Sequence, residues 1–326
     1  MIKKIFITGG AGYVGTVLSN YLLEKGYEVT IYDLLIYGAH FKSNKNLQIV
    51  KGDIRDKKKI KSFIKNHDAV IHLACISNDP SFELNPNLGK EINYDSFEPL
   101  VKISKDEGIK RFIYASSSSV YGVKKEPNVT EEMKLEPLTD YSKYKALCEE
   151  ILIKYSTKDF VTLIVRPATV CGYSPRQRLD LVVNILTNLA YHKRRILVYG
   201  GDQLRPNIHI NDMIRAYEVF LKASENKINR KVYNVGFDNM TVNQLAEEVK
   251  FIIGSDVSIE KVLTNDNRSY HISSKKISSE LGFENKFTIR DAVKDLQDAF
   301  IKKNLINCLD NEEYFNIKKM KSLNLK

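Results

Sequence analysis

A glycine-rich turn close to the N-terminus constrains the fold most strongly. The apolar run Ile5-Phe6-Ile7 leads directly into residues 8–15, which read TGGAGYVG. Gly9 and Gly10 permit a tight turn, Gly12 permits close approach of the backbone to a ligand, and Gly15 lets a helix pack on the preceding strand. Free N–H groups at the start of that helix attract anions. One reading is a turn without a ligand. The other is a strand, turn and helix that bind the pyrophosphate of a dinucleotide through Gly9, Gly12, Tyr13, Val14 and Gly15.

An acidic residue follows at the spacing that such a turn requires. A second strand, predicted over residues 28–32, ends at Asp33, roughly 20 residues beyond the glycines, where a carboxylate binds the adenosine ribose. Leu34 and Leu35 come next, so neither neighbour supplies a cation for a 2′-phosphate. The sequence therefore predicts NAD as the cofactor rather than NADP.

Composition excludes several classes of protein. The 326 residues fit one large or two ordinary domains, and a hydrophobic content of 43% supports a substantial core. The chain lacks an apolar run of about 18 residues, and Gly9 interrupts the N-terminal one too early for a signal peptide. A cytoplasmic protein without a membrane segment is expected.

Charge and cysteine usage exclude further classes of protein. The formal charge is +10, but the lysines are scattered among acids and form no nucleic-acid motif. We therefore expect a solvated surface that favours anionic small substrates, and no nucleic-acid partner. The four cysteines and six histidines lack metal-ligand spacing, so we expect reduced thiols and no bound metal.

Apolar, β-branched segments alternate with helical patterns along the first half of the chain. Strands are predicted at 2–7, 28–32, 47–51, 69–74, 111–116, 161–166 and 231–235, and helices at 13–25, 56–66, 95–107, 140–156 and 211–225. This alternation predicts an α/β fold with a Rossmann-type, doubly wound parallel sheet. We expect a cofactor domain over 1–170 to which 211–235 returns, a smaller α/β substrate domain over 171–210 and 236–303, and an accessory helix or tail over 304–326.

Acid–base residues follow the fifth predicted strand. Residues 116–119 are all serine, and Tyr141 and Lys145 open the next helix four positions apart, on one helical face. A nearby ammonium and a nicotinamide ring lower the pKa of a phenol, which can then act as a base. A second pair at the same spacing, Tyr121 and Lys125, is followed by a glycine in a predicted loop and is set aside.

Along the chain come the glycine-rich turn, the acid at the end of the second strand, the serine run and then Tyr141 and Lys145. In this ordered set of motifs the sequence resembles the extended short-chain dehydrogenase/reductase family, and specifically its nucleotide-sugar epimerases and dehydratases. The resemblance extends to about residue 300. It implies that Ser117, Tyr141 and Lys145 are catalytic and that Tyr141 and Lys145 also bind the cofactor. It further implies cofactor contacts at Asp33, Asp53, Ile54, Leu73, Ala74, Asn93 and Pro167.

The same resemblance implies a sugar-nucleotide substrate. Arg205 matches an arginine that binds the substrate pyrophosphate, and Arg268 is similar to a second one. Further substrate contacts are expected at Ser77, Asn78, Ser118, Thr169, Arg176 and Arg178. For these arginines the alternative is an ordinary structural or surface ion pair.

Departures from the family pattern narrow the set of reactions that we expect this chain to catalyse. Sugar 4,6-dehydratases carry two acids where this chain has Ser118 and Ser119, so water loss is not expected. UDP-galactose-type 4-epimerases tend to have asparagine where Thr169 stands. The segments around residues 77–81 and 176–181 look most like dehydrogenases that oxidise carbon 4 of GDP-manno-heptose in bacterial capsule synthesis.

We therefore expect NAD-dependent oxidation of a sugar 4-hydroxyl, with a GDP-sugar as the favoured substrate and a 2-oxo acid to re-oxidise NADH. The alternative is a 4-epimerase with a transient 4-keto sugar. A third reading, a non-catalytic NAD sensor or nucleic-acid-binding relative, is disfavoured because Ser117, Tyr141 and Lys145 are all present. The resemblance also implies a homodimer or higher homo-oligomer through helices 95–107 and 140–156.

Overall fold

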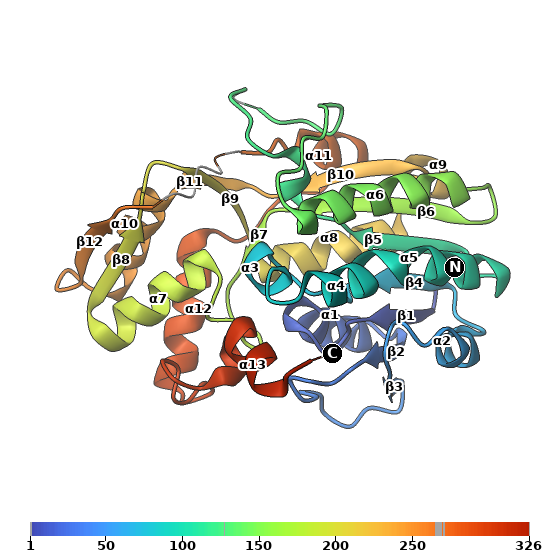
Figure 1. Ribbon diagram of the computed structural model, residues 1–326, viewed down its shortest axis with the longest axis horizontal. Coiled ribbons are helices and arrows are strands. Elements are labelled where there is room, and N and C mark those ends of the chain that lie inside the picture. Colours follow the sequence, from blue (N-terminus) through green and yellow to red (C-terminus); the bar gives the residue numbers. More distant parts are fainter. Residues whose placement is uncertain (1, 127, 265–268, 270, 326) are drawn as a thin grey trace.

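A parallel β-sheet forms the centre of the molecule. The computed structural model describes residues 2–126, 128–264, 269 and 271–325. In this part of the chain, seven parallel strands run in the order β10-β6-β5-β4-β1-β2-β3 (Figure 1). Their bounds are β1 Lys4–Thr8, β2 Glu28–Asp33, β3 Leu47–Lys51, β4 Ala69–His72, β5 Arg111–Ala115, β6 Val161–Pro167 and β10 Lys231–Val235. The predicted α/β fold with a Rossmann-type sheet is confirmed.

The central strands are apolar on both faces because helices cover both sides of a parallel sheet. Ile5, Phe6 and Ile7 of β1 are completely buried. In the register of the sheet, Thr8 lies opposite Tyr32 of β2 and His72 of β4. The carboxyl ends of β1, β2 and β4 therefore reach the same edge, where ligands bind in sheets of this kind.

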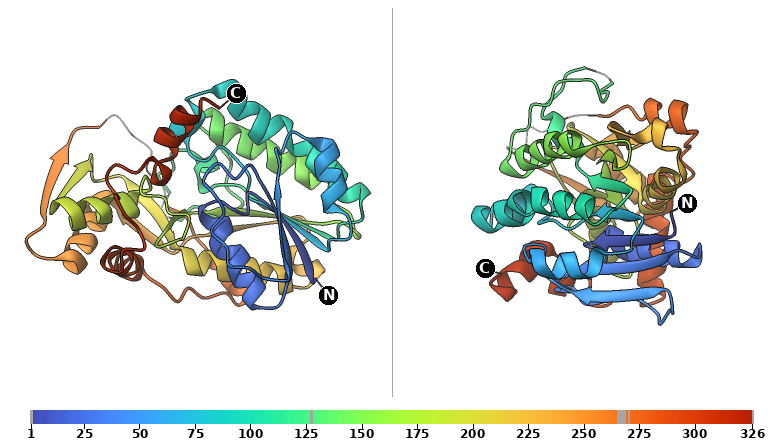
Figure 2. Two further views of the ribbon diagram at one scale, coloured as in Figure 1. Left: turned by 90° about the horizontal axis from the view of Figure 1, so that it is seen from below. Right: turned by 90° about the vertical axis from the view of Figure 1, so that its right-hand side faces the viewer.

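Helices cover the two faces of the sheet (Figure 2). On one face lie α1 (Tyr13–Glu24) and α8 (Ile210–Lys222), which contact each other. On the other lie α2 (Lys57–Ile64), α5 (Phe97–Asp106) and α6 (Asp140–Tyr155). Short elements complete this part: α3 Asp79–Phe82, α4 Pro86–Lys90, π-helix η1 Glu91–Asp95, 3₁₀-helix η2 Ser118–Tyr121, α9 Glu225–Ile228 and α11 Lys275–Leu281.

Two small sheets and three helices form a second hydrophobic core. One sheet has the order β11-β9-β7 and the other pairs β12 with β8. The strands are β7 Thr169–Cys171, β8 Arg195–Tyr199, β9 Leu204–His209, β11 Asp238–Thr241 and β12 Ser258–Val262, and the helices are α7 Val182–Lys193, α10 Val242–Ile253 and α12 Ile289–Ile301. Apolar residues of the three helices and of β8 pack together here. The domain boundaries expected from the sequence remain a prediction.

The C-terminal segment is folded against the rest of the chain. After α12 it contains a 3₁₀-helix, η3 (Glu312–Tyr314), and α13 (Asn316–Leu323). Leu305 and Cys308 pack into a small core with Leu179, whose backbone N–H donates to the Tyr314 carbonyl at 2.8 Å. From there α13 runs back to α3, at the carboxyl edge of the main sheet (Figure 1).

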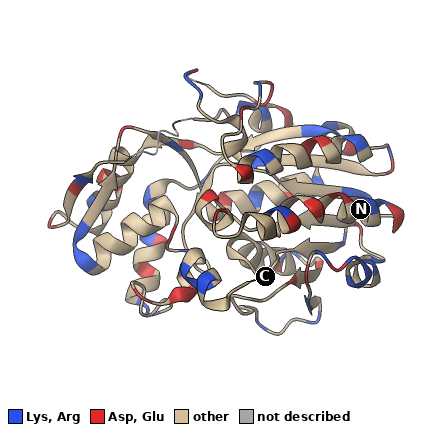
Figure 3. Cartoon of the chain, in the orientation of Figure 1, with Lys and Arg blue, Asp and Glu red and all other residues tan. Residues whose placement is uncertain are grey.

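The surface carries charges of both signs. Lys and Arg are interspersed with Asp and Glu over both parts of the molecule (Figure 3). Among the described helices, none combines the length and the apolar character needed to cross a lipid bilayer.

Candidate functional site

A cavity of about 550 Å³ opens at the carboxyl edge of the main sheet. It lies between the glycine-rich turn, the ends of β4 and β5, the start of α6, the loop after β7 and α13. Most residues predicted to bind ligands line it: Gly9, Gly12, Tyr13, Val14, Gly15, Asp33, Ile54, Leu73, Ala74, Ser77, Asn78, Ser117, Ser118, Tyr141, Lys145, Pro167, Thr169, Arg176, Arg178 and Arg205. The fold thus brings together segments from the whole chain at one cavity.

The glycines of the turn are required by close backbone contacts. A Cβ on Gly9 would lie 2.5 Å from the Ala74 backbone nitrogen, and Gly9 has a φ of +72°. A Cβ on Gly15 would lie 2.4 Å from the Gly9 carbonyl oxygen. Gly12 is the N-cap residue of α1, so the free N–H groups of that helix begin at the cavity. This is the geometry that binds a pyrophosphate.

Asp33 lies at the end of β2 and lines the same cavity. One carboxylate oxygen accepts a hydrogen bond from the Ala11 N–H at 3.0 Å, and the other accepts one from the Leu35 N–H at 2.8 Å. Burial raises the pKa of this carboxyl, and the two N–H groups and the charge of Arg176 oppose that shift. Arg176 was not considered as a neighbour of Asp33 from the sequence, because 143 positions (176 − 33) separate them.

Two predicted cofactor contacts lie elsewhere. Gly52 and Ile54 line the cavity, but the side chain of Asp53 between them pairs with Arg55 at 2.8 Å. Asn93 is buried behind the cavity, where its amide exchanges hydrogen bonds with the Ile76 backbone at 2.8 and 2.9 Å. Asn93 thus holds the segment after β4 in place. For these two residues a contact with the cofactor stays a prediction.

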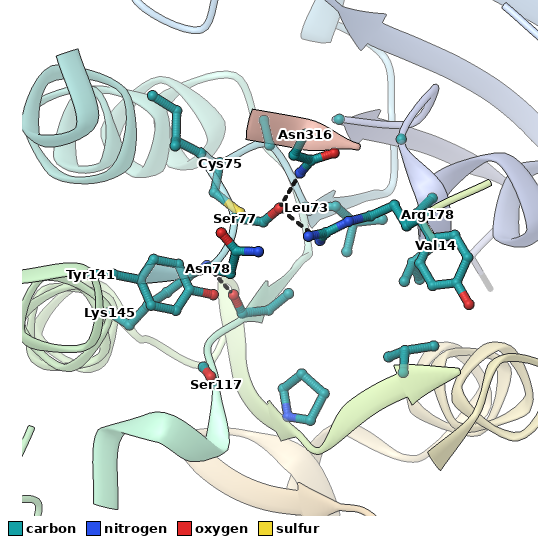
Figure 4. A pocket seen from close by; sticks show the side chains of 18 of the residues that line it. Val14, Leu73, Cys75, Ser77, Asn78, Ser117, Tyr141, Lys145, Arg178 and Asn316 are labelled. Carbon is teal, nitrogen blue, oxygen red and sulfur yellow. Dashed lines mark hydrogen bonds between the residues drawn. The ribbon is translucent and has the colours of Figure 1, made fainter. Parts of the chain in front are cut away.

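Ser117, Tyr141 and Lys145 converge on the cavity, the serine from the end of β5 and the other two from α6 (Figure 4). Ser117 Oγ accepts hydrogen bonds from the Ser119 backbone N–H at 3.1 Å and from Ser119 Oγ at 2.8 Å. Its own hydrogen is therefore available to a ligand in the cavity, and the Ser117 hydroxyl also lowers the pKa of the Tyr141 phenol. This arrangement can hold a hydroxyl or carbonyl group of a ligand against a general base.

Burial dominates the electrostatics of Tyr141. It raises the pKa of the phenol, and the nearby Cys75 and Asp79 raise it further, whereas the hydrogen bond from Ser117 and the charge of Arg178 lower it. The Lys145 ammonium donates to the Ala115 carbonyl at 2.7 Å and lies 5.9 Å from the Tyr141 ring centroid. The sequence assigned the lowering of the Tyr141 pKa to Lys145 and to the nicotinamide ring of the cofactor, which stays a prediction; the structure adds Ser117 and Arg178 as groups that lower it.

A buried ion pair between α6 and β6 lies beneath Ser117, Tyr141 and Lys145. Glu149, two helical turns into α6, pairs with Arg166 of β6 at 2.6 Å, and both side chains are almost fully buried. Ser116 Oγ donates to the same carboxylate at 2.5 Å. Burial disfavours the charge of Arg166, but Glu149 outweighs this and raises the pKa of the guanidinium. The pair therefore connects α6 to the ends of β5 and β6, beside Ser117.

The start of α6 is fixed by a cap and by α3. Thr139 forms a capping box with Ser142 and donates through its hydroxyl to Asp79 at 2.5 Å. Asn78 caps α3 by accepting from the Ser81 N–H at 3.0 Å. Its φ of +74° is unusual for a residue with a Cβ, and such strain is common at ligand sites. Asn78 faces the cavity close to Tyr141 (Figure 4).

The opposite wall of the cavity comes from the loop after β7 and from α13. Arg178 pairs with Asp180 at 2.9 Å and donates to Ser77 Oγ at 3.0 Å (Figure 4). Asn316, the first residue of α13, donates to the same Ser77 oxygen at 3.2 Å. Arg205 lies on β9 and Thr169 on β7, and both line the cavity. Arg268, the second arginine predicted for the substrate, lies outside the described residues.

Four residues of this network were not singled out as site residues from the sequence: Asp79, Glu149, Asp180 and Asn316. For Asp79 and Asp180 the signal was available, since each lies within a segment already associated with the site. Glu149 follows Lys145 at helical spacing, so its position on the inner face of α6 was also available. Asn316 carries no local signal, because 239 positions separate it from Ser77.

Comparison with known proteins shows the family. Residues 5–236 match the NAD dependent epimerase/dehydratase family, and the chain belongs to it. It is 29% identical over 280 residues to a UDP-N-acetyl-alpha-D-glucosaminuronate decarboxylase of Bacillus cytotoxicus, which covers 80% of this chain and 84% of that protein. The structure resembles UDP-glucose 4-epimerase of Thermotoga maritima with UDP-glucose, with a TM-score of 0.82 and 25% identity, covering 92% of this chain and 99% of that one. It also resembles the fold of MoeE5 in complex with UDP-glucuronic acid and NAD, with a TM-score of 0.80 and 24% identity over 93% of this chain and 100% of that one.

The protein is therefore an enzyme of an NAD-dependent, nucleotide-sugar-modifying family. The residues present fit this cofactor. The turn admits no Cβ at Gly9 or Gly15, the start of α1 faces the cavity, and Asp33 lies at the end of β2. When bound, NAD supplies the hydride acceptor; the chain supplies the groups that hold it and that move the proton.

Proposed function

We propose that the enzyme oxidises the 4-hydroxyl of a nucleotide sugar. The observation that carries this proposal is that Ser117, from the end of β5, and Tyr141 and Lys145, from α6, line the same cavity. Tyr141, as phenolate, takes the proton of the sugar hydroxyl while hydride leaves carbon 4. Ser117 donates a hydrogen bond to the carbonyl oxygen that develops. Lys145, held by the Ala115 carbonyl, binds the ribose of the cofactor.

The residues next to Ser117 argue against elimination of water. A dehydration at carbons 5 and 6 needs an acid and a base beside the catalytic hydroxyl. Here Ser119 donates to Ser117, and Ser118 is buried. Neither hydroxyl can serve as a carboxylate would. We therefore place the reaction among oxidations and epimerisations at carbon 4.

We propose a GDP-sugar of the manno-heptose type as the substrate. The two segments whose sequence supports this choice, residues 77–81 and 176–181, meet in the cavity through the contact between Arg178 and Ser77. Arg205 and Arg268 are the proposed ligands of the substrate pyrophosphate, and Ser77, Asn78, Ser118, Thr169, Arg176 and Arg178 are further proposed contacts. A 2-oxo acid is the proposed oxidant that returns NADH to NAD.

A second function, 4-epimerisation, is favoured by the likeness to the Thermotoga maritima UDP-glucose 4-epimerase. In that reaction the 4-keto sugar rotates and takes the hydride back on its other face, so the mass of the sugar is unchanged.

Mass spectrometry separates the two functions. The enzyme is incubated with NAD, a 2-oxo acid and a panel of GDP-, UDP- and dTDP-sugars that includes GDP-manno-heptose. We expect a product lighter by two hydrogens from the GDP-heptose. A product of unchanged mass with a new retention time would replace dehydrogenation with epimerisation, and turnover of UDP- or dTDP-sugars alone would reject the GDP-sugar.

We also propose a homodimer in which α5 and α6 of two copies pack together. Leu147, on the outer face of α6, is an exposed apolar side chain that such packing would cover. Light scattering should give twice the mass of the chain or a higher multiple, and a monomer at working concentration would reject the proposal.

A further inference from the structure

Arg176 carries a buried positive charge that no carboxylate of the described residues pairs with directly. The residue is 3% exposed and lines the cavity. Its guanidinium donates to two neutral acceptors, Asn316 Oδ1 at 2.7 Å and the Gln177 carbonyl at 3.3 Å, and its carbon lies 3.6 Å from the ring centroid of Tyr37. Among the described residues its Nε has no hydrogen-bond partner and no acid forms a salt bridge with it. Burial and the charge of Arg178 lower its pKa to about 10, although the nearby Tyr37, Asp180 and Asp33 oppose that shift.

Arg178, two positions later, differs in this respect. Its guanidinium makes two hydrogen bonds to Asp180, which neutralises it within the protein. Buried charges in proteins are paired, or they face a ligand of opposite sign. The loop thus presents one neutralised arginine and one whose charge is available to an anion in the cavity.

The surroundings of Arg176 favour the cofactor as the source of that anion. The charge of Arg176 acts on the Asp33 carboxyl at the end of β2 and on the buried phenol of Tyr13 in the glycine-rich turn. Tyr37 follows β2 in the chain. These positions surround the adenosine end of the dinucleotide site and the turn that binds its pyrophosphate.

Asn316 holds Arg176 in this position without cancelling its charge. Arginine only donates, so the amide oxygen of Asn316 must face Arg176, and its Nδ2 then faces Ser77. The backbone N–H of Asn316 donates to Asp180 at 3.0 Å. One residue of α13 thereby contacts Arg176 itself and both side-chain partners of Arg178, Asp180 and Ser77. Ser77, which accepts from Asn316 and Arg178, keeps its own hydrogen for a ligand.

We propose that Asn316 is a positioning residue of the dinucleotide site, which keeps the guanidinium of Arg176, held by no direct salt bridge, directed at a phosphate of the cofactor. The C-terminal segment is then a wall of the cofactor site, since Met320 and Leu325 line the cavity as well. This inference moves Arg176 from the substrate contacts proposed above to the cofactor, and it does not depend on which sugar is the substrate. The cofactor and a sugar-nucleotide substrate both carry a pyrophosphate. The experiment must therefore distinguish which of the two supplies the phosphate that Arg176 binds.

The test measures binding by calorimetry, with ADP-ribose as the probe for the cofactor and GDP and UDP as probes for the substrate. Asn316→Asp keeps the size of the side chain and supplies a carboxylate to Arg176. We expect it to leave the melting temperature at or above that of the unaltered protein, yet to weaken ADP-ribose binding about tenfold to a hundredfold. Asn316→Ala should weaken it less, because the charge of Arg176 survives although its position is lost.

Two further variants complete the experiment. Arg176→Gln should weaken ADP-ribose binding as much as Asn316→Asp does, and its loss should disappear in high salt, where screening removes the contribution of the charge. Asn304→Ala is the matched control, an exposed asparagine of the same segment, and should bind as the unaltered protein does. Unchanged ADP-ribose affinity in Asn316→Asp would overturn the proposal. So would a loss confined to GDP or UDP, because the phosphate would then belong to the substrate.

Discussion

The cavity has two sides that are built by different means. Its floor consists of strand ends and the first turns of helices, where backbone contacts fix each residue, as between Gly15 and the Gly9 carbonyl. Its wall consists of the loop after β7 and α13, which contact the floor through side chains, as between Arg178 or Asn316 and Ser77. Backbone positions on a parallel sheet leave little freedom, whereas a hydrogen bond between side chains changes with one substitution. The floor therefore suits the chemistry of the reaction, and the wall suits the recognition of ligands.

The largest expected effect lies on the floor. Tyr141→Phe removes the base and should lower turnover by about 10³-fold or more, with little change in NAD or nucleotide binding. Tyr144→Phe is the control, since this phenol is on the same helix but stacks on Tyr94. Steady-state kinetics and calorimetry measure both quantities. A turnover close to that of the unaltered enzyme would remove Tyr141 from the mechanism.

The next largest effect concerns the buried ion pair of Glu149 and Arg166, which packs beneath the floor. Glu149→Gln leaves Arg166 buried and unpaired, so the free energy of unfolding should fall by about 3–5 kcal/mol. The control is Glu260→Gln, which breaks an exposed pair with Arg195 and should cost less than about 1 kcal/mol. Urea denaturation followed by circular dichroism measures both. Equal effects of the two variants would mean that the buried pair does not stabilise the floor.

A backbone contact of the turn can be tested by a single methyl group. Gly15→Ala places a Cβ against the Gly9 carbonyl, where no side chain can move away, so NAD affinity should fall about tenfold or more. Gly282→Ala is the control, because its φ of +66° strains a side chain there but its Cβ meets open space. It should lose stability and keep NAD affinity. Binding that survives in Gly15→Ala would show that the floor is more adaptable than its geometry indicates.

The smallest expected effect compares the two sides directly. The charge of Asp79, on the floor, raises the pKa of Tyr141, and that of Arg178, on the wall, lowers it. Because the phenolate is the active form, Asp79→Asn should move the rise of kcat with pH to lower pH, and Arg178→Gln should move it to higher pH. Profiles measured at saturating substrate test this. Shifts of the same sign in both variants would contradict it.

Much of the floor was predictable because its signals are local. The seven strands of the main sheet appear as short apolar runs, and Tyr141 and Lys145 share a helical face at a spacing of four. The strands of the smaller sheets were not predicted. β9 contains Arg205, Pro206 and Asn207, and β11 is largely polar, so these segments become strands through pairing with each other rather than through their own pattern.

The wall was predictable only in part for a related reason. The sequence predicted Arg176 and Arg178 as substrate contacts. Their hydrogen-bond partners, however, come from segments that are far away in the sequence. The absence of a cation at residues 34 and 35 was a local observation, whereas the structure brings Arg176 to Asp33 from 143 positions downstream (176 − 33). The partner of Asp53 was not predicted: its neighbours Gly52 and Ile54 line the cavity, while its own carboxylate pairs with Arg55.

The pair of Glu149 and Arg166 has a consequence for how such chains diverge. Loss of either charge alone leaves the other buried and unpaired, which destabilises the fold. Substitutions at the two positions must therefore occur nearly together. Ser116 and Tyr121, which hydrogen-bond to the pair, restrict these substitutions further. We expect the two positions to covary across descendants of this chain, and the residues of the wall to drift independently of them.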